Sequence, residues 1–157
     1  MIVTTEPDLR AALDVERWVT DVSSASPFDS LESLLATAHA AATPLSTEEI
    51  DQAMAHHPRI GEKPAGEGAA QAFSRIEQAS ADASDAAVSA QIADGNVAYE
   101  EKFGRVFLIR AAGRTRAEIL SELQRRIRLD DAEEIQNVGE QLRDIALLRL
   151  EKLYGEA

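Results

Sequence analysis

The sequence predicts an all-α protein, organised as a single-domain bundle of about seven to eight helices. Alanine is abundant, runs of β-branched residues are short, and no Asn-Gly or Asp-Gly turn separates two alternating segments as in a β-hairpin. Two segments match the Ser/Thr-x-x-Glu capping box, in which side chain and backbone satisfy each other's hydrogen bonds at a helix start. Because 157 residues can bury one sizeable core, we expect one domain over residues 1–157.

The two capping boxes place the starts of two helices, at Ser46 to Glu49 and at Thr115 to Glu118. Composition and apolar periodicity place the others. In chain order the predicted helices are Pro7–Val19, Phe28–Ala41, residues 46–56, about 69–79, about 84–102, 116–128 and Asp131–Tyr154.

Two connecting segments are marked by glycine. Residues 61–68 contain three glycines and Pro64, which predicts a loop that shapes or covers a pocket. Gly104 and Gly113 bracket an apolar run over residues 105–112, whose shortness suits either a buried extended segment or a short helix. Periodicity does not separate these two alternatives.

Composition excludes several classes of function. The formal charge of −12 disfavours nucleic acid and anionic membranes as partners, and the absence of cysteine removes thiol nucleophiles and thiolate metal sites. Residues 1–10 do not resemble a signal peptide, and no run reaches the roughly 20 apolar residues of a membrane span. Residues 154–157 lack a peroxisomal tripeptide, so we expect a cytoplasmic protein.

His57 is the first candidate for chemistry, because imidazole exchanges a proton near neutral pH. Pro58 disfavours a helical backbone at His57, Arg59 adds a nearby positive charge, and the glycines that follow allow a ligand to approach the backbone. The alternative is a histidine at a helix end with no chemical role. A metal site is disfavoured, because the spacing of His39, His56 and His57 provides no ligand set.

Glu77 is the second candidate. Ser74, Glu77 and Gln78 are spaced i, i+3 and i+4, so on a helix a hydroxyl, a carboxylate and an amide emerge from one face. Such a trio suits a small, amide-rich anionic molecule, although a solvated polar face has the same pattern.

Arg149 stands out by periodicity. Ile135, Val138, Leu142 and Ile145 form an apolar stripe along the last predicted helix, and the next position on that stripe is Arg149. The arginine either extends to the surface along its methylene stem or is held inside, where its guanidinium would bind a carboxylate.

Five motifs occur in order along nearly the whole chain. They are Trp18 with Pro27-Phe28, His57-Pro58-Arg59-Ile60-Gly61, Ser74-x-x-Glu77-Gln78, Asn96-x-x-Tyr99-x-x-Lys102-Phe103-Gly104-x-x-Phe107, and Arg149-Leu150. Together they resemble the 2-oxo-4-hydroxy-4-carboxy-5-ureidoimidazoline (OHCU) decarboxylase family of uric acid degradation. The chain departs from the family pattern at Asp14 to Glu16, at Arg110 and at Leu129.

The resemblance implies an all-helical homodimer that decarboxylates OHCU to (S)-allantoin without a metal or organic cofactor. His57 matches the catalytic acid, Glu77 its carboxylate partner, and Arg149 the arginine that holds the substrate's carboxylate. The residues that match substrate contacts are Pro58, Ser74, Arg75, Ile76, Gln78, Phe107, Leu108, Ile109 and Ala111.

Two other classes of function remain open from the sequence. One is a non-catalytic helical binding module, in which the acidic surface serves a protein partner and His57 is structural. The other is a related small-molecule lyase or hydrolase that uses the same histidine and glutamate on a ureido analogue.

Overall fold

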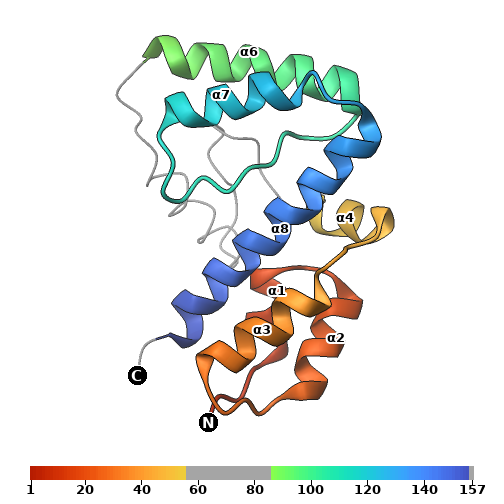
Figure 1. The fold of residues 1–157 in the computed structure, drawn as a ribbon, viewed down its shortest axis with the longest axis vertical. Coiled ribbons are helices and arrows are strands. Elements are labelled where there is room, and N and C mark those ends of the chain that lie inside the picture. The colour runs from red at the N-terminus through yellow and green to blue at the C-terminus, as the bar shows by residue number, and fades with distance from the viewer. Residues whose placement is uncertain (56–85, 156–157) are drawn as a thin grey trace. The chain divides into compact units, whose positions relative to one another are not determined.

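The computed structural model describes residues 1–55 and 86–155, and within them the fold is all-α, as predicted (Figure 1). Seven helices lie in the described residues, and none of these residues forms a sheet strand. The helices are α1 (Glu6–Ala12), α2 (Glu16–Ala25), α3 (Leu31–Ala41), α4 (Thr47–Met54), α6 (Ala86–Phe103), α7 (Arg116–Arg126) and α8 (Asp131–Tyr154).

The chain divides into two compact units. The first, here the terminal unit, is Met1–His56 with Gly139–Ala157, and the second, the central unit, is His57–Val138. Helix α8 contributes residues to both units. That residues 1–157 form one domain stays a prediction.

The prediction of a single helix over residues 7–19 is wrong, because the backbone is not helical between the end of α1 at Ala12 and the start of α2 at Glu16. Leu13 and Val15 have extended backbones, with φ of −154° and −127°. The apolar pattern explains the break. A stripe that continued from Leu9 and Leu13 would next reach Glu16, whereas the buried residues of α2 follow the phase of Val15. The interruption lets both stripes be buried.

Helix α3 begins at Leu31, three residues after the predicted start at Phe28. The Phe28 backbone is engaged elsewhere, since its N–H donates to the Ile2 carbonyl at 2.7 Å and its carbonyl accepts from the Ile2 N–H at 2.6 Å. The Ser30 hydroxyl instead caps the helix by accepting from the Ser33 N–H at 3.1 Å. Trp18, which is fully buried, links α2 to α3 through a 3.1 Å bond from its indole N–H to the Ala38 carbonyl.

Both predicted capping boxes are confirmed, at Ser46 with Glu49 and at Thr115 with Glu118. Helix α8 has the predicted bounds, α6 ends at Phe103, and α4 and α7 end two residues before the predicted positions. The helix predicted over about 69–79 and the loop predicted over 61–68 lie outside the described residues.

The apolar run after α6 is not helical, which resolves the alternative that the sequence left open. Gly104 and Gly113 have φ of 72° and 79°, a region that glycine enters without strain, so each glycine permits the turn at its end of the run. In the central unit α6 packs against α7, and the cluster of buried residues between them includes Tyr99, Phe107 and Leu123. Among the described helices none has the length and apolar character that crossing a bilayer would need.

Candidate functional site

The residues predicted for the site fall into three groups. The first group lies outside the described residues and consists of His57, Pro58, Ser74, Arg75, Ile76, Glu77 and Gln78. Phe107, Leu108, Ile109 and Ala111 belong to the central unit, and Arg149 belongs to the terminal unit. The structure therefore describes two parts of the candidate site, each within its own unit.

Arg149 is buried, with only 2 % of its surface exposed, so the alternative in which it extends to the surface is wrong. Its Nη1 donates a 3.0 Å hydrogen bond to the carbonyl of Ala11. Ala11 lies in the last turn of α1, where carbonyls have no partner within the helix and the helix dipole favours a positive charge. The end of α1 thus fixes the position of this guanidinium.

The buried stripe that leads to Arg149 differs from the predicted one at its first residue. Val138, Leu142 and Ile145 are buried as expected, but Ile135 is only partly buried and Glu134 is fully buried in its place. The stripe of α8 therefore begins at a carboxylate and reaches a guanidinium, with aliphatic side chains between them.

The segment over residues 107–111 is buried in the central unit. Phe107, Ile109 and Ala111 all belong to the hydrophobic cluster between α6 and α7, and Arg110 between them is partly exposed. Alternate side chains in one core are the period of an extended chain. Phe107, Ile109 and Ala111 therefore pack into one core, and Leu108, which is not part of this cluster, is also buried.

A buried ionic network adjoins this segment, and our reading of the sequence did not single it out. Glu134 accepts from Arg126 at 3.0 Å through Nε and at 2.6 Å through Nη2, and it also accepts from the Tyr99 hydroxyl. Arg126 is 1 % exposed and Glu134 is 0 % exposed, so both charges are removed from water. Such a pair is stable only with close geometry and further hydrogen bonds, which Tyr99 and the 3.2 Å bond from Asn137 supply.

Arg126 also reaches the candidate site itself. Its Nη1 donates a 2.7 Å hydrogen bond to the carbonyl of Leu108, and its guanidinium carbon lies 4.7 Å from the centre of the Phe107 ring. The pKa of Tyr99 is raised, first by burial and then by its hydrogen bond to Glu134, so the phenol stays protonated and keeps donating to the carboxylate. The sequence did contain a signal, because Ile119, Leu123 and Arg126 follow the same helical stripe.

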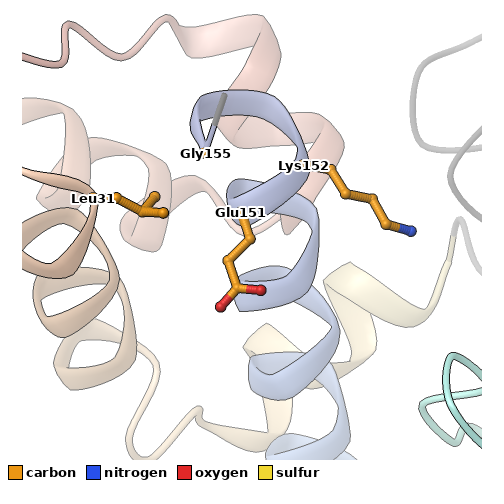
Figure 2. Close-up of a pocket in the computed structure, with 4 residues that line it drawn as sticks. All are labelled: Leu31, Glu151, Lys152 and Gly155. Carbon is orange, nitrogen blue, oxygen red and sulfur yellow. The ribbon is translucent and has the colours of Figure 1, made fainter. Parts of the chain in front are cut away.

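Two further observations on the described residues add no candidate for a catalytic or metal-binding site. Within residues 1–55 and 86–155, no three histidine or acidic side chains gather as a metal site would require. A hollow of about 450 Å³ in the terminal unit is lined by Leu31, Glu151, Lys152 and Gly155 (Figure 2). The Glu151 and Lys152 side chains point in different directions from the last turns of α8, so they do not converge on a ligand.

Comparison with known proteins identifies relatives along most of the chain. A sequence model of the family described as OHCU decarboxylase matches residues 5–151. The chain is 28 % identical over 155 residues to an Arabidopsis thaliana protein named uric acid degradation bifunctional protein TTL, with 96 % of the chain covered. It spans 48 % of that relative's length, about half.

Two solved structures have a similar fold. One is a crystal structure of OHCU decarboxylase in the presence of (S)-allantoin, with a TM-score of 0.79 and 24 % identity, covering 97 % of this chain and 100 % of that one. The other is a crystal structure of (S)-allantoin synthase, with a TM-score of 0.67 and 16 % identity, covering 94 % of this chain and 48 % of that one. At these identities the likeness establishes the fold.

Proposed function

The chain belongs to the OHCU decarboxylase family, and from this we propose that it is a carboxy-lyase that converts OHCU to (S)-allantoin in the degradation of uric acid. The observation that carries the proposal is the family match over residues 5–151, which includes every residue predicted for the site. The burial of Arg149 supports it, because an arginine held inside the protein is suited to bind a carboxylate.

The reaction that we propose needs no organic electron sink. Loss of carbon dioxide leaves an electron pair on carbon, which the conjugated imine and carbonyl groups of the substrate ring delocalise. The protein then has to orient the carboxylate that leaves, stabilise the developing charge and protonate one face of the carbanion.

We assign these tasks to the residues that match the family motifs. Arg149 holds the substrate's carboxylate, and His57 donates the proton that sets the S configuration. Glu77 orients the His57 imidazole and raises its basicity, as a carboxylate partner does. Pro58, residues 74–78 and residues 107–111 contact the substrate. We also propose that the protein acts as a cytoplasmic homodimer with no metal or organic cofactor.

The test of this function is circular dichroism of OHCU generated in situ from urate, with chelator present and no added metal. Without enzyme nothing chiral directs the proton, so the background product is racemic and gives no signal. We expect wild-type protein to yield optically active allantoin rapidly, and His57→Ala to lower kcat by about 10²-fold or more, the scale of acid–base catalysis.

His39→Ala is the matched control, because His39 lies exposed in the last turn of α3, and we expect it to keep wild-type kinetics. If the wild type leaves the racemic background unchanged, the decarboxylase assignment fails. A non-catalytic helical binding module, or a lyase for another ureido compound, would then replace it. If the wild type is active and His57→Ala keeps its full activity, the proposed function stands and the proton donor is another residue.

A further inference from the structure

The strongest unassigned feature of the structure is the buried network of Tyr99, Arg126 and Glu134 in the central unit. Arg126 is the residue of this network that bonds to the candidate site, through the carbonyl of Leu108 at 2.7 Å. We propose that Arg126, locked by Glu134, is a positioning residue that sets the backbone of residues 107–111 for substrate. The proposal rests on the proposed function, because it concerns the segment that we expect to contact OHCU.

The first argument is the geometry of the guanidinium. Two of its three nitrogens, Nε and Nη2, bond to Glu134 at 3.0 and 2.6 Å, which fixes the plane of the group. The third, Nη1, is thereby directed at the Leu108 carbonyl. Because a buried N–H without an acceptor is costly, this third bond ties the position of the guanidinium to the backbone of the segment.

The second argument is that the segment is held from one edge. The Leu108 carbonyl accepts from Arg126, and two residues on the Arg110 carbonyl accepts from Arg114 Nε at 2.9 Å. In an extended chain, carbonyls two residues apart point the same way and those between point the opposite way. Fixing this edge therefore fixes the direction of the N–H and C=O groups of Ile109 on the other edge.

The third argument is burial. Arg126, Glu134 and Tyr99 are each no more than 1 % exposed, so water cannot replace a bond that is lost. Phe107 packs under the guanidinium at 4.7 Å, and its ring is itself 5.2 Å from that of Tyr99. A displacement of Arg126 therefore changes the surroundings of Phe107 as well as the Leu108 carbonyl.

The test compares Arg126→Lys with Arg125→Lys. A lysine at position 126 keeps the positive charge beside Glu134, but its single ammonium group cannot reproduce the planar, two-point bond and reach Leu108 as well. Arg125 is the adjacent residue, its side chain is 56 % exposed and it pairs with Glu122, so its replacement leaves the network intact. The measurements are kcat and KM for OHCU, the enantiomeric excess of the allantoin, and amide hydrogen exchange of the peptide that covers residues 105–113.

We expect Arg126→Lys to raise KM about tenfold, to lower the enantiomeric excess and to accelerate exchange in residues 107–111, with Arg125→Lys unchanged in all three. If Arg126→Lys does not fold, Tyr99→Phe/Arg126→Met/Glu134→Leu removes the whole network without leaving a buried charge, and the same results are expected of it. Wild-type KM and enantiomeric excess in a folded variant would overturn the positioning role alone. An inactive wild type would instead overturn the proposed function, and with it this inference.

Discussion

Each of the two units buries an arginine, and the bonds that the structure describes for the two side chains differ in kind. In the central unit Arg126 makes a two-point bond with the carboxylate of Glu134, which is itself fully buried. In the terminal unit Arg149 donates to a backbone carbonyl at the end of α1. Helical periodicity predicts that both arginines lie on a buried stripe of a helix. The role of each arginine depends on the group to which its guanidinium is bonded. We expect Arg126→Met, which leaves the Glu134 carboxylate without its partner, to act mainly on stability, and Arg149→Ala to act mainly on substrate binding.

The largest expected effect is on the stability of the protein when Arg126 is replaced by methionine. The change leaves the Glu134 carboxylate buried without its guanidinium, which costs about 3–5 kcal/mol of the free energy of unfolding in comparable cases. Urea unfolding followed by far-ultraviolet circular dichroism measures it. Arg125→Met is the control, because its ion pair with Glu122 is exposed and contributes about 1 kcal/mol or less.

A suppressor sharpens this prediction. Arg126→Met/Glu134→Leu removes the stranded carboxylate, so we expect the double variant to recover most of the stability lost in Arg126→Met. If the single variant loses less than about 1 kcal/mol, or if Glu134→Leu adds to its loss, the ion pair is not what stabilises the central unit.

Two helix-interior glycines extend the comparison between the units, with opposite signs expected. A Cβ at Gly95 in α6 would lie 2.5 Å from Leu123 Cδ2 and 3.1 Å from its Cγ, whereas at Gly139 in α8 it would lie 3.3 Å from Ile50 Cδ1 and 3.9 Å from its Cγ1. Alanine gains about 1 kcal/mol over glycine in a helix, while overpacking costs about 1–3 kcal/mol.

We therefore expect Gly95→Ala to lower stability by up to about 2 kcal/mol and Gly139→Ala to leave it unchanged or raise it. Thermal unfolding of the two variants beside wild type tests this. Equal shifts of the two melting temperatures would contradict it, because the packing of α6 against α7 would then accept a methyl group as easily as the contact of α8 with Ile50.

The Arg149 half of the comparison is tested by kinetics. On the proposed function, Arg149→Ala should raise KM for OHCU about tenfold or more with a smaller change in kcat, since a carboxylate clamp acts mainly in binding. Arg143→Ala is the control on the same helix, because its described ion pair is with Asp144 beside it. A near-wild-type KM in folded Arg149→Ala would remove Arg149 from the substrate site.

The sequence predicted those parts of the fold that depend on neighbouring residues. Both capping boxes and the bounds of α8 were predicted because side chains three or four residues apart decide them. The break between α1 and α2 was missed because each stripe looks helical by itself, and only the shift in phase between Leu13 and Val15 separates them. The extended backbone of Phe28 was missed because it depends on a bridge to Ile2, far away in the sequence.

The candidate site divides in the same way. The odd position of Arg149 on its stripe was visible in the sequence, and burial has decided between the two alternatives for its side chain. Periodicity marks Arg126, but its partner was not visible, because Glu134 is one of the acidic residues that are common in the first turn of a helix. Its burial follows from contacts with Tyr99 and Arg126, which lie 35 and 8 residues away in the chain.

The smallest expected effects concern the two capping boxes, one in each unit, which have the same pattern of hydrogen bonds. In both folded boxes the glutamate pKa lies below its ordinary value near 4.5, for Glu49 chiefly through its hydrogen bond to Arg17 and for Glu118 chiefly through the Thr115 backbone N–H. Each charged form therefore adds stability above pH 4.5 that is lost as the pH falls through the folded pKa.

Glutamine can replace glutamate in a capping box, so Glu118→Gln should change stability little. Glu49→Gln also breaks the ion pair with Arg17, whose side chain is 44 % exposed, so we expect a loss of up to about 1 kcal/mol at pH 7 and a smaller decline toward pH 3 than in wild type. Urea unfolding at pH 7 and pH 3 in low salt measures both variants. Equal losses at pH 7 would mean that Arg17 contributes nothing, and that the two helix starts are held by their caps alone.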